Sequence, residues 1–83
     1  MNAKEVLIIT MEECGELVQA CSKVMRSNGK EKYLTNLKEE IGDVYLMLEL
    51  LKQHGYVSDE DINQRQQLKR KKLKKWSNLD VRR

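Results

Sequence analysis

Residues 11–25 read MEECGELVQACSKVM, and residues 37–51 read LKEEIGDVYLMLELL. Each stretch contains an acidic motif, Glu12-Glu13-Cys14-Gly15-Glu16 in the first and Glu39-Glu40-Ile41-Gly42-Asp43 in the second. Apolar residues recur around both motifs at the three- and four-residue spacing of an amphipathic helix. The two stretches therefore predict two helices, each of which carries a pair of carboxylates one turn apart on one face.

The acids lie within apolar surfaces rather than beside them. At about 100° per residue, apolar residues fall within roughly 40° of Glu13 on one helix and of Glu40 on the other. These residues are Val6, Ile9, Leu17, Ala20 and Val24, and Tyr33, Val44, Met47 and Leu51. Burying a lone ionised carboxylate costs on the order of several kcal/mol or more. Two such positions facing each other need a compensating positive charge, and we predict a metal ion.

The ligand set decides which metal is expected. Glu13, Glu16, Glu40 and Asp43 would offer only oxygen atoms between two antiparallel helices, which suits Mg²⁺ or, as a substitute, Mn²⁺. A di-iron site would need a Glu-x-x-His motif, and the single histidine, His54, lies eleven residues beyond Asp43. Iron is thus disfavoured, and zinc more strongly. A lone Glu-x-x-Glu pair is typical of a solvated surface, but two pairs centred on apolar arcs are harder to explain in that way.

The composition favours an all-α protein, because the 83 residues include no proline, four glycines and 35% charged residues. We expect helices over residues 3–26, from between Lys30 and Thr35 to His54-Gly55, and from the Ser58-Asp59-Glu60-Asp61 capping pattern to about Trp76. The expected fold is an antiparallel helical hairpin plus a third helix. We assign residues 1–78 to a single domain and residues 79–83 to a flexible C-terminal tail.

The first helix has more apolar surface than one partner helix can cover. A second stripe follows a heptad-like spacing: Leu7, Met11, Cys14, Val18, Cys21 and Met25. The run Val44–Leu51 is also apolar nearly all round. We therefore expect a homo-oligomer, a dimer or a tetramer, with a four-helix-bundle core built from the first two helices.

Location and cysteine chemistry follow from simple counts. No stretch approaches the ~20 apolar residues of a membrane span, and the N-terminal residues do not resemble a signal peptide. We expect no membrane contact and a cytoplasmic location, or the host cytoplasm for a viral protein.

Cys14 and Cys21 lie about 10 Å apart along one helix, too far to form a disulfide with each other. We expect both to be buried as small apolar side chains.

At this point the sequence resembles the MazG-like, all-α nucleoside triphosphate pyrophosphohydrolases, whose pattern is E-E-x-x-E followed by E-x-x-D. The likeness extends through "EECGELVQA…EEIGDVYLMLELL" and covers most of residues 5–79. The lysine-rich third helix ending in "LKKWSNL" is similar to compact versions associated with bacteriophages. The resemblance implies Mg²⁺-dependent cleavage of a nucleoside or deoxynucleoside triphosphate at the α–β phosphate bond, giving the monophosphate and pyrophosphate. It also implies a helical oligomer with sites near subunit interfaces.

The resemblance also implies roles for individual residues. Glu13, Glu16, Glu40 and Asp43 correspond to the family's metal ligands. Glu12 matches the first motif glutamate but points about 100° from Glu13, so it either positions or deprotonates the attacking water or is plain surface. Glu12 and Glu13 are the candidate catalytic residues.

Candidate substrate ligands come from the rest of the chain. Lys69 and Lys72 on the third helix are candidates for the phosphates, against a reading of the basic run as a solvated face. Asn36 is a candidate for base or sugar, and the competing interpretation makes it a helix cap together with Thr35.

A different class of function must be considered for the basic third helix. Residues 59–83 carry nine Lys/Arg against four Asp/Glu, whereas residues 1–58 carry seven against nine. The segment Lys69–Lys75, with six basic residues in seven, could attract nucleic acid without any further motif. A non-enzymatic nucleic-acid-binding module is therefore the alternative, although it leaves the carboxylates unexplained and they would repel nucleic acid.

Overall fold

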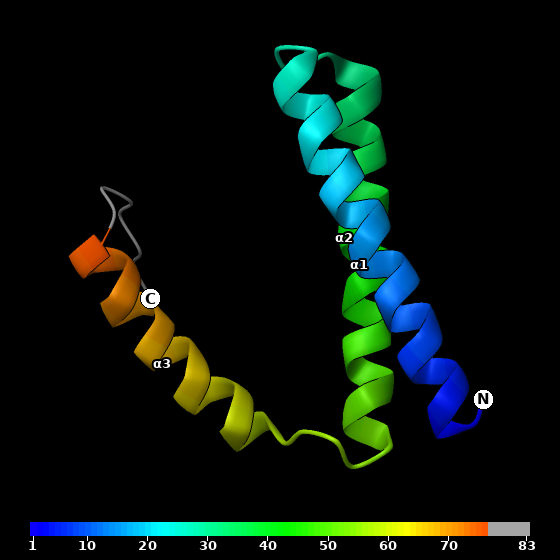
Figure 1. Cartoon of the computed structure of the whole chain (residues 1–83), viewed down its shortest axis with the longest axis vertical. Helices are drawn as coiled ribbons and strands as arrows, with labels where there is room; N and C mark the ends of the chain where they lie inside the picture. Colours follow the sequence, from blue (N-terminus) through cyan, green and yellow to red (C-terminus); the bar gives the residue numbers. More distant parts are fainter. Residues whose placement is uncertain (77–83) are drawn as a thin grey trace.

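The computed structural model describes residues 1–76 and contains three helices (Figure 1). They are α1 (Ala3–Arg26), α2 (Glu31–Gln53) and α3 (Asp59–Trp76). The described part of the chain contains no strand, which confirms the all-α prediction. All three helices lie within one or two residues of their predicted bounds. The proposed tail over residues 79–83 lies outside the described residues.

Helix α1 begins and ends where local hydrogen bonding predicts. The Asn2 side chain accepts a hydrogen bond from the Glu5 backbone N–H at 2.9 Å, and the Glu5 carboxylate accepts one from the Asn2 N–H at 3.4 Å. This capping box supplies partners for groups that the first turn leaves free. At the other end, Asn28 and Gly29 take positive φ angles of 58° and 80°. The Gly29 N–H returns to the Val24 carbonyl at 2.9 Å, which stops the helix.

Helix α2 runs back along α1 to form the predicted antiparallel hairpin (Figure 1). It begins after Lys30, whose side chain makes no capping hydrogen bond. It ends at Gln53, and Gly55, two residues later, has a φ of 81°, while the Tyr56 N–H reaches the Leu51 carbonyl at 3.0 Å. Because the first turn of α2 precedes Asn36, that residue lies inside the helix. The interpretation of Asn36 as a helix cap is therefore wrong.

The core of the hairpin is small. Val6, Ala20 and Met47 are the buried apolar residues of the described chain. The second apolar stripe of α1 points away from α2, and Met11, Val18 and Met25 are 67%, 69% and 82% exposed. Cys14 and Cys21 share this outward face and are exposed free thiols, so the expectation that they are buried is wrong for a single chain.

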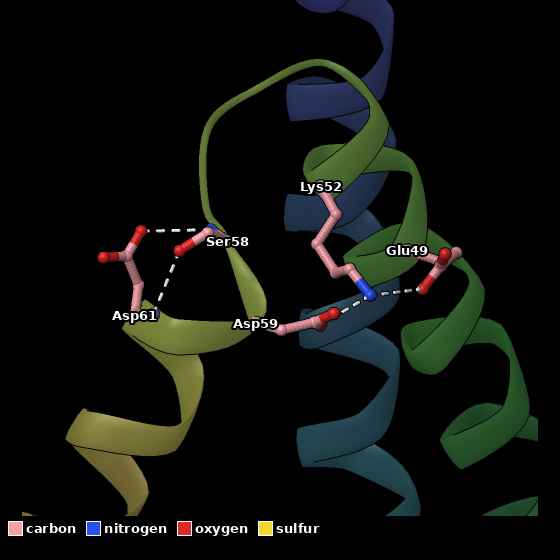
Figure 2. Close-up of polar contacts among 5 residues, drawn as sticks. All are labelled: Glu49, Lys52, Ser58, Asp59 and Asp61. Carbon is pink, nitrogen blue, oxygen red and sulfur yellow. Dashed lines mark hydrogen bonds and ion pairs between the residues drawn. The ribbon is translucent and has the colours of Figure 1, made fainter.

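Helix α3 is attached at its first turn and then leaves the hairpin. Lys52 of α2 forms ion pairs with Asp59 at 2.8 Å and with Glu49 at 3.2 Å (Figure 2). Figure 1 shows the rest of α3 diverging from α1 and α2. Among the described residues, no helix is long and apolar enough to cross a membrane.

The start of α3 is set by a reciprocal cap. The Asp61 N–H donates to the Ser58 hydroxyl oxygen at 3.1 Å, and the Asp61 carboxylate accepts from the Ser58 N–H at 3.0 Å (Figure 2). Hydrogen bonds from the Ser58 backbone and side chain lower the pKa of Asp61 below its ordinary value of 3.8. The cap stabilises the ionised carboxylate and weakens as the pH falls through that lowered pKa.

Replacing Ser58 by alanine should raise the pKa of Asp61 part of the way toward 3.8, because alanine loses the hydroxyl but keeps the backbone N–H that is the larger cause of the shift. The substitution should also lower the helical content of α3. A side-chain NMR titration of Asp61 measures the first effect, and the amide chemical shifts of α3 measure the second. Ser22→Ala is the matched control, because Ser22 lies inside α1 and caps no helix. An unchanged Asp61 pKa together with an unchanged helical content of α3 in Ser58→Ala would contradict this description of the cap.

Candidate metal centre

Three of the predicted ligands meet between the middles of α1 and α2. Glu13 comes from α1, whereas Glu40 and Asp43 lie one turn apart on α2. One carboxylate oxygen from each residue can be chosen so that all three atoms lie within 4.8 Å of one another. The antiparallel hairpin creates this cluster, because it places the central turn of α1 opposite the central turn of α2.

Each of the two glutamates has one buried carboxylate oxygen that lacks a hydrogen-bond partner. Glu13 Oε2 and Glu40 Oε2 are excluded from solvent, and neither has a hydrogen-bond partner. A buried acceptor without a partner is unfavourable and rare in folded proteins. A cation between the two carboxylates would give both oxygens a partner.

The electrostatics of the cluster agree with this geometry. Removal from water raises the pKa of Glu13 above 4.5, and the charges of Glu16 and Asp43 raise it further. The pKa of Glu40 rises from 4.5 to about 7, first through removal from water and then through the nearby charge of Glu16. A cation between the carboxylates would reverse both effects, because it would favour the ionised forms.

The remaining predicted acids lie around the cluster rather than in it. Glu16 is exposed and is not one of the three grouped residues, yet its charge raises the pKa of both Glu13 and Glu40. Hydrogen bonding with Glu16 also raises the pKa of both glutamates, so its carboxylate lies beside the cluster. Glu12 and Glu39 are exposed, on faces turned about 100° from Glu13 and Glu40.

The predicted substrate ligands occupy two different places. Asn36 is half-buried on α2, one turn before Glu40. Lys69 and Lys72 are exposed on α3, and Figure 1 shows this part of α3 well away from the middle of the hairpin. Within one chain, therefore, the structure brings Asn36 but neither lysine near the carboxylates.

The donor set fits a hard divalent cation. Every grouped side chain offers carboxylate oxygen, which Mg²⁺ and Mn²⁺ accept, and no histidine or thiol takes part. The two unpartnered oxygens of Glu13 and Glu40 are the specific observation that favours an ion at this position. Exposed Asp43 leaves one side of the cluster open to solvent, as a site that also binds a substrate requires.

Without a divalent ion, the raised pKa of Glu40 gives stability a defined dependence on pH. Between pH 4.5 and about 7 the folded chain binds more protons at Glu40 than the unfolded chain does. The contribution of Glu40 to the free energy of unfolding is thus present at low pH and is lost as the pH rises through about 7.

Melting temperatures measured in chelator should therefore fall more steeply over this pH range for the natural chain than for Glu40→Gln. Mg²⁺ added at about pH 8 should raise the melting temperature of the natural chain and should have little effect on Glu40→Gln. Glu39→Gln, the same change on the neighbouring exposed residue, should behave like the natural chain. Equal pH and Mg²⁺ responses in both variants would argue against the cluster as a metal site.

Comparison with known proteins adds one finding. The family profile of the MazG nucleotide pyrophosphohydrolase domain matches residues 2–76, which include all three helices and the carboxylate cluster. No curated protein and no solved structure gives a significant match to the chain. The match spans most of the 83 residues, and the chain belongs to the MazG nucleotide pyrophosphohydrolase domain family.

Proposed function

We propose that the protein hydrolyses nucleoside or deoxynucleoside triphosphates at the α–β phosphate bond, releasing the monophosphate and pyrophosphate, with Mg²⁺ as the cofactor and Mn²⁺ as a substitute. The observation that carries this proposal is the convergence of Glu13, Glu40 and Asp43 around two buried, unpartnered oxygens. Membership of the MazG nucleotide pyrophosphohydrolase domain family supports a nucleotide as the substrate.

Each acid of the cluster has a distinct task in this proposal. Glu13, Glu40 and Asp43 would hold the ion, and Glu16 lies beside them as the fourth ligand. A bound divalent ion supplies charge neutralisation for the phosphates and activation of a water molecule. Glu12 precedes Glu13 in the sequence and is exposed to solvent. In this proposal its carboxylate would orient that water or accept its proton.

The phosphates also need cations on the side away from the acids. Lys69 and Lys72 are the proposed ligands, and the divergence of α3 means that they would act on the hairpin of another copy of the chain (Figure 1). Asn36, on the same face of α2 as Glu40, would contact the base or sugar. A second copy would therefore complete the substrate site.

The shape of the single chain supports such an assembly. Its radius of gyration is 15.1 Å, whereas a compact domain of this length has roughly 12 Å. Its accessible surface is 6860 Å², about 1,700 Å² more than a compact monomer of this mass exposes. That excess is larger than the area of about 800 Å² per partner in a standard interface. We infer a homo-oligomer, a dimer or a tetramer.

The basic segment of α3 supports an alternative function, the binding of nucleic acid. Lys69, Lys71, Lys72, Lys74 and Lys75 are all exposed in the structure. Their charge does not explain the unpartnered oxygens of Glu13 and Glu40, and this is why hydrolysis is favoured. The two functions differ in their dependence on Glu40, because salt-dependent binding to phosphates through α3 would not require it.

Glu40→Gln and Asp43→Asn should each reduce hydrolysis by at least about 100-fold, because each removes an ion ligand whose effect is worth several kcal/mol. Chromatography after incubation with Mg²⁺ and a panel of triphosphates separates the products. Equimolar monophosphate and pyrophosphate are expected, and Glu39→Gln should retain activity. Diphosphate and phosphate as products would refute cleavage at the α–β bond. No turnover of any triphosphate with Mg²⁺ or Mn²⁺ would refute the proposal that the protein is a hydrolase.

Val18→Lys should weaken the assembly, because Val18 lies at the centre of the exposed apolar stripe of α1. Gln19→Lys is the matched control, with the same charge added at the neighbouring exposed polar position. Light scattering coupled to size-exclusion chromatography should show a smaller species for Val18→Lys alone. A natural chain that is monomeric at micromolar concentration would contradict the proposed oligomer.

A further inference from the structure

A second polar feature lies at the turn between α1 and α2, at the end of the hairpin opposite the α2–α3 connection (Figure 1). Lys23, Arg26, Ser27, Lys30 and Tyr33 line a hollow of about 340 Å³. The volume is near the lower end of the roughly 300–1,000 Å³ found for small-molecule sites. It is large enough for an anion of several heavy atoms.

The cations around this hollow have no carboxylate to neutralise them. In the described part of the chain, neither Lys23, Arg26 nor Lys30 has an acidic oxygen within 4 Å, because both ion pairs found there belong to Lys52. Residues 23–32 contain four basic side chains and a single acid, Glu31. Three like charges around one hollow repel each other, and an anion between them would relieve that repulsion.

The wall of the hollow is held by specific contacts. The Ser27 hydroxyl donates to the Val24 carbonyl at 3.2 Å and accepts from the Lys30 N–H at 3.2 Å. The Arg26 Nε donates to the Ser22 carbonyl at 3.4 Å, which leaves its two terminal amino groups for a ligand. Tyr33 also lines the hollow, and the Lys32 ammonium lies 4.9 Å from the centre of its ring.

The hollow is distinct from the carboxylate cluster. Lys23 lies seven residues beyond Glu16 on α1, and Tyr33 lies seven residues before Glu40 on α2. Each separation corresponds to about 10 Å along a helix axis. Along this face of the hairpin, acids therefore lie at the centre and cations lie at the turn.

We propose that the α1–α2 turn is a separate anion site that binds a pyrophosphoryl group. Three cations distributed around one hollow match an anion whose charge is spread over two phosphoryl units better than a single small ion. Arg26 supplies a planar fork and the two lysines supply mobile point charges. The uncapped first turn of α2 adds a favourable dipole beside the hollow. The inference rests on the hollow and does not require the proposed hydrolysis.

The test uses the full ¹⁵N-labelled chain in chelator, so that no divalent ion can hold phosphate at the carboxylates. Inorganic pyrophosphate is titrated first, followed by a nucleoside diphosphate. Saturable shifts are expected for the amides of Ser27, Gly29 and Glu31, with those of Glu13 and Asp43 nearly unchanged. Raising the salt concentration should weaken the affinity.

Paired charge reversals provide the control. Lys23→Glu with Lys30→Glu should weaken pyrophosphate binding at least about tenfold, since each charge-assisted contact is worth more than 1 kcal/mol. Lys4→Glu with Lys38→Glu makes the same change in net charge at exposed positions outside the hollow and should have little effect. Circular dichroism verifies that both variants fold, and the titration of the natural chain tests the site without any variant.

Each outcome decides the proposal. Binding of both ligands would assign the site to a pyrophosphoryl group carried by a nucleotide, and binding of pyrophosphate alone would assign it to the free anion. Absence of saturable shifts at the turn would overturn the proposal, as would equal losses in both paired variants. Shifts produced by single-stranded DNA and not by pyrophosphate would also overturn it. Hydrolysis measured separately with Mg²⁺ distinguishes failure here from failure of the proposed function.

Discussion

The central constraint on this structure is electrostatic. Two helices place carboxylates against each other, and within residues 1–76 no positively charged side chain forms an ion pair with them to neutralise their charge. Glu13 and Glu40 each hold an oxygen away from water, and both pKa values are raised by that desolvation and by the neighbouring acids. A hairpin designed for stability alone would place apolar residues there, because buried like charges oppose folding. The arrangement is therefore understandable as a cation site whose unfavourable electrostatics are relieved by binding.

The single chain has a small core and a large exposed apolar surface. Within residues 1–76, Val6, Ala20 and Met47 form the buried core, while large apolar side chains along α1 and α2 remain exposed. Two helices cannot surround a four-helix core by themselves. Helix α3 is tied to α2 through Lys52 and Asp59 and then diverges from the hairpin (Figures 1 and 2). In our proposal the missing core and the missing phosphate ligands are supplied by the same partner.

Charge is also arranged along the molecule in a consistent way. Acids gather at the middle of the hairpin, and separate groups of cations occupy the α1–α2 turn and the second half of α3. The formal net charge of +3 conceals this pattern, because opposite charges cancel in the sum. In the proposed function the acids would hold the metal and the cations would contact phosphate, so the separation would keep each group from neutralising the other.

Local patterns in the sequence were enough to determine the three helices, the N-terminal caps of α1 and α3, and the pairing of the two acidic motifs. Asn2 with Glu5 and Ser58 with Asp61 act within one turn, so their effect does not depend on the rest of the fold. Only the tertiary structure decided that Glu16 lies outside the closest carboxylate group, that Cys14 and Cys21 are exposed, and that Lys23, Arg26 and Lys30 surround one hollow. Helical periodicity gives the direction of a side chain around its own axis, whereas these features depend on how the helices cross and on the path of the turn that joins them.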